Sequence, residues 1–130
     1  MTNPSTTVLI VDDSPILRRS IRKSLSQAGL PEDSILEAGN GAEAMTMLAE
    51  TDIALVLLDL NMPVMNGEAT LAAMRENPST AEVPVVIVTT EGNISRLLRL
   101  QSMGIRGYLR KPFQPEDLRE LVGDVLNLAS

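Results

Sequence analysis

The chain has 130 residues, which is enough for one domain with its own hydrophobic core. It contains no cysteine and no histidine, which excludes disulfides, thiolate chemistry, serine–histidine triads and histidine-ligated zinc. The formal net charge of −6 argues against nucleic acid as a partner, and the apolar runs are too short for membrane insertion. The start, Met1 to Thr7, shows no signal peptide, so we expect a cytoplasmic protein.

Five apolar or β-branched runs alternate with five helical patterns, which predicts an α/β fold with a parallel sheet. The expected strands are Val8–Val11, Ser34–Ala38, Ala54–Leu58, Val83–Thr89 and Arg106–Leu109. The first, third and fourth are almost continuously hydrophobic and are expected at the centre of the sheet, whereas the charged fifth is expected at an edge. We expect residues 1–6 to form a flexible tail and residues 7–130 to form one domain.

Cap and stop residues mark the expected helices. The first lies between Ser14, a suitable N-cap, and Gly29, a suitable stop, and the second and third follow Asn40-Gly41 and Asn66-Gly67. The fourth and fifth are expected at about Asn93 to Met103 and from near Pro115. The side chains expected to face the core are Leu17, Ile21, Leu25 and Ala28, then Ala42, Met45 and Leu48, then Leu71 and Met74, and finally Leu118, Leu121, Val122, Val125 and Leu126.

Acids and one lysine stand where the expected strands end. Asp12 and Asp13 close the first run, Asp59 closes the third, Thr89 ends the fourth, and Lys111 follows the fifth. The carboxyl ends of parallel strands meet at one edge of a sheet, where ligands of open α/β folds bind. Two like charges about 4 Å apart repel by roughly 4 kcal/mol at an effective dielectric near 20. A divalent cation is therefore the expected ligand of these acids.

Two features of the first helix have a second interpretation. Asp12 is also able to cap the helix, as Ser14 is, although one cap does not need two adjacent acids. The basic cluster Arg18, Arg19, Arg22 and Lys23 is either a solvated helix face or a docking site for an acidic partner.

Several motifs together resemble the receiver domain of bacterial two-component response regulators, and most closely the stand-alone CheY-like chemotaxis type. The motifs are Val11-Asp12-Asp13-Ser14, Leu57-Leu58-Asp59-Leu60-Asn61-Met62-Pro63, Asn66-Gly67, Val88-Thr89 and Gly107-Tyr108-Leu109-Arg110-Lys111-Pro112-Phe113. The resemblance extends from about Thr7 to Leu128 and implies a receiver domain over residues 7–130. It also implies a flavodoxin-like (βα)5 three-layer sandwich with a five-stranded parallel sheet of order 2-1-3-4-5, as in CheY.

The same resemblance implies a role for each site residue. Asp59 would be the phosphoacceptor, taking a phosphoryl group from the histidine of a kinase or phosphotransfer protein. Lys111 and Thr89 would bind the phosphoryl oxygens, and the Lys111–Pro112 peptide bond would be cis.

Magnesium is the cofactor that the resemblance implies. Asp13, Asp59 and the backbone carbonyl of Asn61 would hold Mg²⁺ directly, and Asp12 would act through water.

Switching and phosphoryl lifetime are likewise implied by the resemblance. Thr89 and Tyr108 would change position on phosphorylation and remodel a protein-binding face made of the fourth helix, the fifth strand and the fifth helix. At least one leucine of Leu97-Leu98-Arg99-Leu100 is expected on that face. Asn61 and Glu91 would tune dephosphorylation, and the protein would be a signalling switch rather than an enzyme.

Other functions stay open at this stage. The chain is also compatible with a phosphorelay intermediate, a stand-alone receiver outside chemotaxis, or a binding module that does not need phosphorylation. A magnesium-dependent phosphatase is disfavoured because Asp59-Leu60-Asn61 lacks a second acid. A nucleotide or flavin binder is disfavoured because Asp12-Asp13-Ser14-Pro15 is not a glycine-rich phosphate loop.

Overall fold

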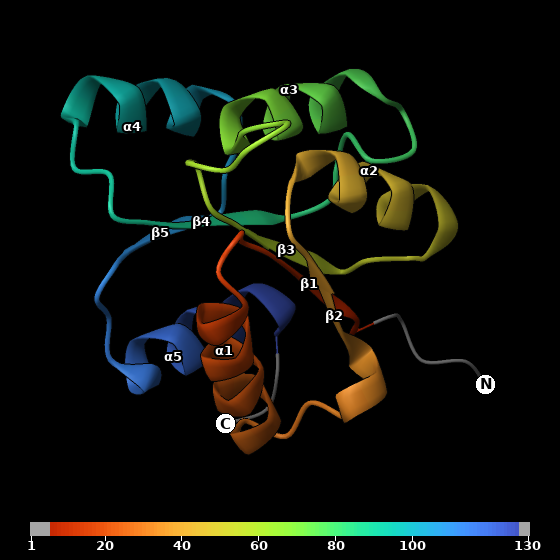
Figure 1. Ribbon diagram of the computed structural model, residues 1–130, viewed down its shortest axis with the longest axis vertical. Helices are drawn as coiled ribbons and strands as arrows, with labels where there is room; N and C mark the ends of the chain where they lie inside the picture. The colour runs from red at the N-terminus through yellow and green to blue at the C-terminus, as the bar shows by residue number, and fades with distance from the viewer. Residues whose placement is uncertain (1–5, 128–130) are drawn as a thin grey trace.

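A parallel sheet lies at the centre of the computed structural model, which describes residues 6–127 (Figure 1). Its strands are β1 (Val8–Val11), β2 (Ile35–Ala38), β3 (Leu55–Leu58), β4 (Val85–Thr89) and β5 (Gly107–Arg110). Their order in the sheet is β2-β1-β3-β4-β5, which confirms the predicted flavodoxin-like topology. Residues 1–5 of the expected tail, and residues 128–130, lie outside the described range.

Helices alternate with the strands along the chain. They are α1 (Pro15–Gln27), α2 (Gly41–Glu50), α3 (Gly67–Glu76), α4 (Ile94–Ser102) and α5 (Pro115–Leu126), with a short 3-10 helix, η1 (Glu32–Ser34), before β2. The side chains of Ser14, Asn40, Asn66 and Asn93 each accept a backbone N–H from the first turn of the helix that follows. Within residues 6–127, none of the helices has the length and apolar character needed to cross a membrane.

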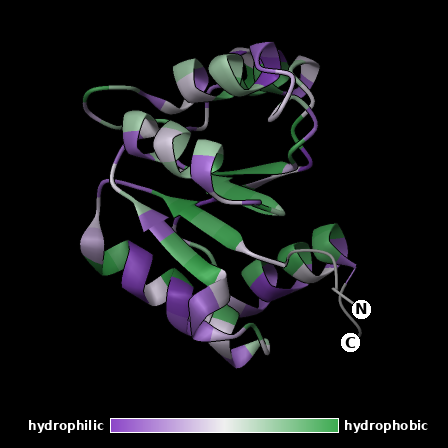
Figure 2. Cartoon of the chain, turned by 90° about the vertical axis from the view of Figure 1, so that its right-hand side faces the viewer, coloured by the Kyte–Doolittle hydropathy of each residue, from purple (hydrophilic) through white to green (hydrophobic). Residues whose placement is uncertain are grey.

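The helices form two layers around the sheet: α2, α3 and α4 cover one face, and α1 and α5 cover the other (Figure 1). Side chains of the central strands alternate between these layers, so Leu9 and Val11 of β1 pack on one side while Val8 and Ile10 pack on the other. All residues of β1, β3 and β4 are buried, as expected for central strands. Figure 2 shows the hydrophobic strands between helices that combine apolar and polar faces.

A few predicted boundaries and inward positions are wrong. β4 begins at Val85 rather than Val83, because Pro84 has no N–H to donate to the sheet. Ser34 belongs to η1. Ala42 is exposed because the buried positions of α2 are Gly41, Ala44 and Leu48. Ala28 is exposed because it is the C-cap of α1, beyond the last helical turn.

Candidate functional site

The sheet register brings the predicted site residues to one edge. Val11 of β1 pairs with Leu58 of β3, and the backbone N–H of Asp59 donates to the Val11 carbonyl at 2.9 Å. On the other side of β3, the backbone N–H of Lys111 donates to the carbonyl of Thr89 at 2.8 Å. The peptide bond from Lys111 to Pro112 is cis, as predicted.

Three carboxylates converge at this edge. Oxygens of Asp12, Asp13 and Asp59 all lie within 4.8 Å of one another. Asp12 and Asp59 are only 2% and 6% exposed, whereas Asp13 is exposed to solvent. Lys111 Nζ lies 2.7 Å from Asp12 Oδ2 and 3.6 Å from Asp59 Oδ1. One ammonium group therefore faces three acids, which leaves the cluster short of positive charge.

Burial is the largest influence on the pKa of Asp59. Burial raises the pKa of this carboxyl above its ordinary value; the Lys111 ammonium lowers it and the Asp12 carboxylate raises it further. Backbone N–H groups of Leu60, at 2.8 Å, and Asn61 also hydrogen-bond the carboxylate and favour its charged form. The effect of burial is nevertheless larger, so the pKa of Asp59 is raised. The negative charge of Asp59 is therefore only partly neutralised in the metal-free protein.

These residues fit a magnesium ion. The donors are hard carboxylate oxygens from two neighbouring strand ends, two of them buried, and their charge exceeds that of the single lysine. Asp12 is not the cap of α1: its Oδ1 accepts the Ser14 N–H at 2.8 Å, and Ser14 itself caps the helix by accepting the Leu17 N–H. The acidic cluster is thus available to a cation rather than committed to helix capping.

The start of α3 lies directly against Asp59. The Gly67 N–H donates to the Leu60 carbonyl at 2.9 Å, and a Cβ at position 67 would lie 2.2 Å from the Asp59 carbonyl oxygen. Glycine is therefore required for this close approach of helix and strand end. The sequence marked Asn66-Gly67 as a helix start but did not reveal this contact with the site.

Glu91 connects the two predicted switch residues. Thr89 is fully buried, and its Oγ1 accepts the Glu91 N–H at 3.3 Å. The Tyr108 hydroxyl, from the edge strand β5, donates to the Glu91 carbonyl. Thr89 and Tyr108 are therefore linked through the backbone of a single residue, which sequence reasoning had considered only for its side chain.

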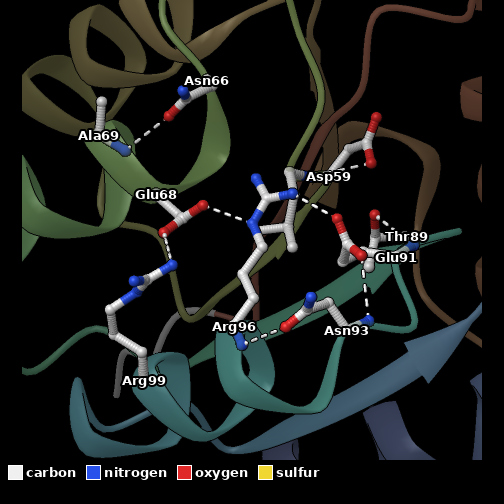
Figure 3. Close-up of polar contacts among 10 residues, drawn as sticks. Asp59, Asn66, Glu68, Ala69, Thr89, Glu91, Asn93, Arg96 and Arg99 are labelled. Carbon is white, nitrogen blue, oxygen red and sulfur yellow. Dashed lines mark hydrogen bonds and ion pairs between the residues drawn. The ribbon is translucent and has the colours of Figure 1, made fainter.

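Arg96 is a neighbour of the site that sequence reasoning missed. Its side chain extends from the first turn of α4 and lies between Glu91 and Glu68, as Figure 3 shows. Its place in the first turn is a usable signal, because a cation is unfavourable near the positive end of a helix unless acids surround it.

Two residues of the basic cluster on α1 pair with an acid of the sheet. Arg18 and Arg22 both pair with Glu37 of β2, and Arg18 also donates to the backbone carbonyl of Asp12. Arg19 and Lys23 are exposed, as a solvated face would be. Arg18 thereby positions the backbone of an acid in the carboxylate cluster, a role that neither interpretation of the basic cluster included.

Known proteins are similar to almost the whole chain. The model of the response regulator receiver domain matches residues 8–123. A chemotaxis protein CheY homolog of Campylobacter jejuni is 36% identical over 124 residues, covering 95% of this chain and 94% of that protein. The nitrate/nitrite response regulator NarP of Escherichia coli is 39% identical over 115 residues, covering 88% of this chain but 52% of that protein.

Solved structures agree with the sequence relatives. The chemotaxis response regulator CheY4 of Vibrio cholerae superimposes with a TM-score of 0.83 at 31% identity, covering 92% of this chain and 98% of that one. Together with the sheet order and the acidic cluster, these matches show that the chain belongs to the response regulator receiver domain family of two-component signalling.

Proposed function

We propose that the protein is a chemotaxis-type phosphorylation switch of the cytoplasm, modified on Asp59 by a histidine kinase or phosphotransfer protein. The observation that carries this proposal is the position of Asp59: a nearly buried carboxylate at a strand end, beside two other acids and 3.6 Å from Lys111 Nζ. The similarity of the whole chain to CheY proteins supports chemotaxis as its setting.

The proposed reaction is transfer of one phosphoryl group. A bond forms between a carboxylate oxygen of Asp59 and phosphorus while the bond from phosphorus to the donor nitrogen breaks, and the donor imidazole retains the electron pair. The Lys111 ammonium is close enough to Asp59 to bind a phosphoryl oxygen, and the Thr89 hydroxyl retains a proton to donate while its oxygen accepts the Glu91 N–H.

Mg²⁺ is the proposed cofactor, held by Asp13, Asp59 and the Asn61 carbonyl, with Asp12 acting through water. When bound, the ion supplies positive charge that lets an anionic carboxylate approach an anionic phosphoryl group. Without it, the repulsion among Asp12, Asp13 and Asp59 is offset by Lys111 and by backbone N–H groups.

The hydrogen bonds of Glu91 support a switching role for Thr89 and Tyr108. If the Thr89 side chain moves toward a phosphoryl oxygen, its hydroxyl oxygen is drawn away from the Glu91 N–H that it now accepts. The segment that holds the Glu91 carbonyl then moves relative to the Tyr108 hydroxyl, which donates to it. A change at the buried site therefore reaches the surface of β5 through one residue.

The proposed output face comprises α4, β5 and α5. Its apolar part on α4 is Ile94 and Leu98, which are 72% and 59% exposed. Leu100 is fully buried in the core, so substitutions there would report on folding rather than on binding. Leu98→Ser is expected to weaken binding of a phosphorylation-dependent partner about tenfold. Ile16→Ser is the matched control, because Ile16 is also exposed, at 78%, but lies on α1, across the sheet.

A second candidate function has specific support. The chain is 39% identical to NarP, a response regulator about twice as long as the matched segment. This identity favours a receiver outside chemotaxis or a phosphorelay intermediate as the second candidate. It does not favour a phosphatase or a phosphorylation-independent module. A receiver outside chemotaxis and a phosphorelay intermediate share the same modification of Asp59 and differ only in the partner.

Intact-protein mass spectrometry tests the proposal directly. The protein is incubated with Mg²⁺ and acetyl phosphate, and a mass increase of one phosphoryl group is expected for the wild type and for Asp124→Asn, an exposed acid of α5. Asp59→Asn is expected to show no increase. An unmodified wild type, or equal modification of Asp59→Asn, would overturn the proposal.

A further inference from the structure

Each oxygen of the Glu91 carboxylate has a hydrogen-bond partner, although the residue lies only two positions beyond Thr89. Its Oε1 lies 2.5 Å from Arg96 Nη1, and its Oε2 accepts the Asn93 N–H at 3.0 Å. Figure 3 shows this side chain directed toward the first turn of α4. The Asn93 N–H and the Arg96 guanidinium lower the pKa of Glu91, which makes it a weaker base.

Arg96 is itself held from a second side. Its Nε lies 2.5 Å from Glu68 Oε1 in the first turn of α3, and the side chain is only 19% exposed. Burial opposes the charge of Arg96, but the hydrogen bonds to Glu68 and Glu91 outweigh it and raise the pKa of the guanidinium. Arg96 therefore joins the segment after Asp59 to the segment after Thr89.

Helix propensity does not explain why an arginine occupies position 96 in the first turn of α4. Arg96 occupies the third position of α4, after the N-cap Asn93, where the positive end of the helix disfavours a cation and an acid would be preferred. Its position is instead accounted for by the two carboxylates, which approach from opposite sides.

We propose that Arg96 is a positioning residue that holds the Glu91 carboxylate away from the phosphorylated Asp59 and so lengthens the life of the phosphoryl group. This inference rests on the proposed function. A carboxylate that is free to turn toward phosphorylated Asp59 is able to accept a proton from a water molecule that attacks phosphorus. In the present arrangement both of its oxygens are occupied on the side of α4.

The test measures how fast the phosphoryl mass disappears after acetyl phosphate is removed. Arg96→Ala is expected to lose the group about fivefold faster than the wild type, well below the 10²–10⁴-fold effect of a fully positioned base. The double variant Glu91→Gln with Arg96→Ala is expected to decay at the rate of Glu91→Gln alone, because no carboxylate remains to be released. Arg96→Lys, which keeps one charge contact, is expected to restore most of the lifetime.

Arg99→Ala is the matched control. Arg99 lies on the same helix and pairs with the same Glu68, at 3.3 Å, but is 64% exposed and does not contact Glu91. Its removal is expected to leave the decay rate unchanged. Thermal unfolding tests whether Arg96→Ala and Arg99→Ala are equally folded. If Arg96→Ala is not, Glu68→Gln, which removes the charge on the other side of Arg96, replaces it and is expected to speed the decay.

Two results would overturn this inference while leaving the proposed function intact: an unchanged decay in Arg96→Ala, or the same acceleration in the Glu91→Gln background. A wild type that takes up no phosphoryl group would reject the proposed function, and this inference with it.

Discussion

Glu37 and Asp59 are both largely shielded carboxylates on this sheet, and their surroundings differ in one respect. Glu37, on the edge strand β2, has Arg18 Nε at 3.0 Å and Arg22 Nε at 2.7 Å. Asp59, at the end of the central strand β3, shares one lysine with two other acids. Burial opposes the charged form at both, but the two arginines prevail at Glu37 and lower its pKa, whereas the pKa of Asp59 is raised.

The difference separates a stabilising contact from a binding site. The cations around Glu37 outnumber its own charge, and they join α1 to β2 without need of a ligand. At Asp59 burial outweighs the single ammonium group, so the charged carboxylate lowers the stability of the folded chain, and a bound cation would offset that loss. Neutralising the carboxylate should therefore lower the free energy of unfolding at Glu37 and raise it at Asp59.

Removing Lys111 should have the largest effect. Lys111→Met leaves the buried Asp12 without the ammonium at 2.7 Å, so the free energy of unfolding in metal-free buffer is expected to fall by about 3 kcal/mol. Urea denaturation measures this loss. Millimolar Mg²⁺ is expected to stabilise the variant more than the wild type, because the ion replaces missing positive charge. Lys23→Met, an exposed cation of α1, is the control and should change little.

Removing the charge of Glu37 should have an intermediate effect. Glu37→Gln weakens two charge-assisted contacts and is expected to cost about 1.5 kcal/mol near neutral pH. Because the folded pKa of Glu37 lies below its unfolded value, this stabilisation is present above the unfolded pKa and disappears as pH falls through the folded one. Urea denaturation of the wild type and of Glu37→Gln at a series of pH values should show that the difference in their free energies of unfolding becomes smaller as pH falls.

Glu32→Gln sharpens this second test. Glu32 pairs only with Arg22, at 2.8 Å, and its side chain is 68% exposed, so its loss is expected to cost less than about 0.5 kcal/mol. If Glu32→Gln costs as much as Glu37→Gln, the distinction between a shielded and a solvated ion pair on α1 fails.

The α/β class and the acidic cluster could be predicted from local patterns, whereas the strand order was implied by the family resemblance. Apolar runs such as Val8–Val11 identify the central strands, and parallel topology alone brings the residues after them to one edge. The acids Asp12 and Asp59 were therefore placed correctly without any knowledge of side-chain contacts.

The contacts that surround the cluster could not be predicted in this way. Arg96 of α4 pairs with Glu68 of α3, which lies 28 residues earlier in the chain. Arg18 of α1 pairs with Glu37 of β2, which lies 19 residues later. The first-turn position of Arg96 indicates nearby acids but not which ones, and Arg18 has the same local pattern as a solvated residue, so tertiary packing decides the partner of each. The close approach at Gly67 likewise depends on the angle at which α3 meets β3.

Neutralising Asp59 should have a smaller effect than Lys111→Met or Glu37→Gln, and the opposite sign. The folded pKa of Asp59 lies above its unfolded value, so its charged form costs stability above the folded pKa, and this cost vanishes as pH falls below the unfolded value. In metal-free buffer near neutral pH, Asp59→Asn is expected to gain about 1 kcal/mol, a rise in Tm of roughly 4 °C. Calorimetry of the wild type and of Asp59→Asn should show that the difference in Tm becomes smaller as pH falls.

Mg²⁺ should reverse the order of these two proteins. The wild type retains the complete acidic cluster, so its Tm is expected to rise with Mg²⁺ more than that of Asp59→Asn, until the advantage of the variant is lost. A variant less stable than the wild type in metal-free buffer would mean that Lys111 and the backbone N–H groups already balance Asp59. The contrast with Glu37 would then disappear, and with it the electrostatic reason for a cation at this edge of the sheet.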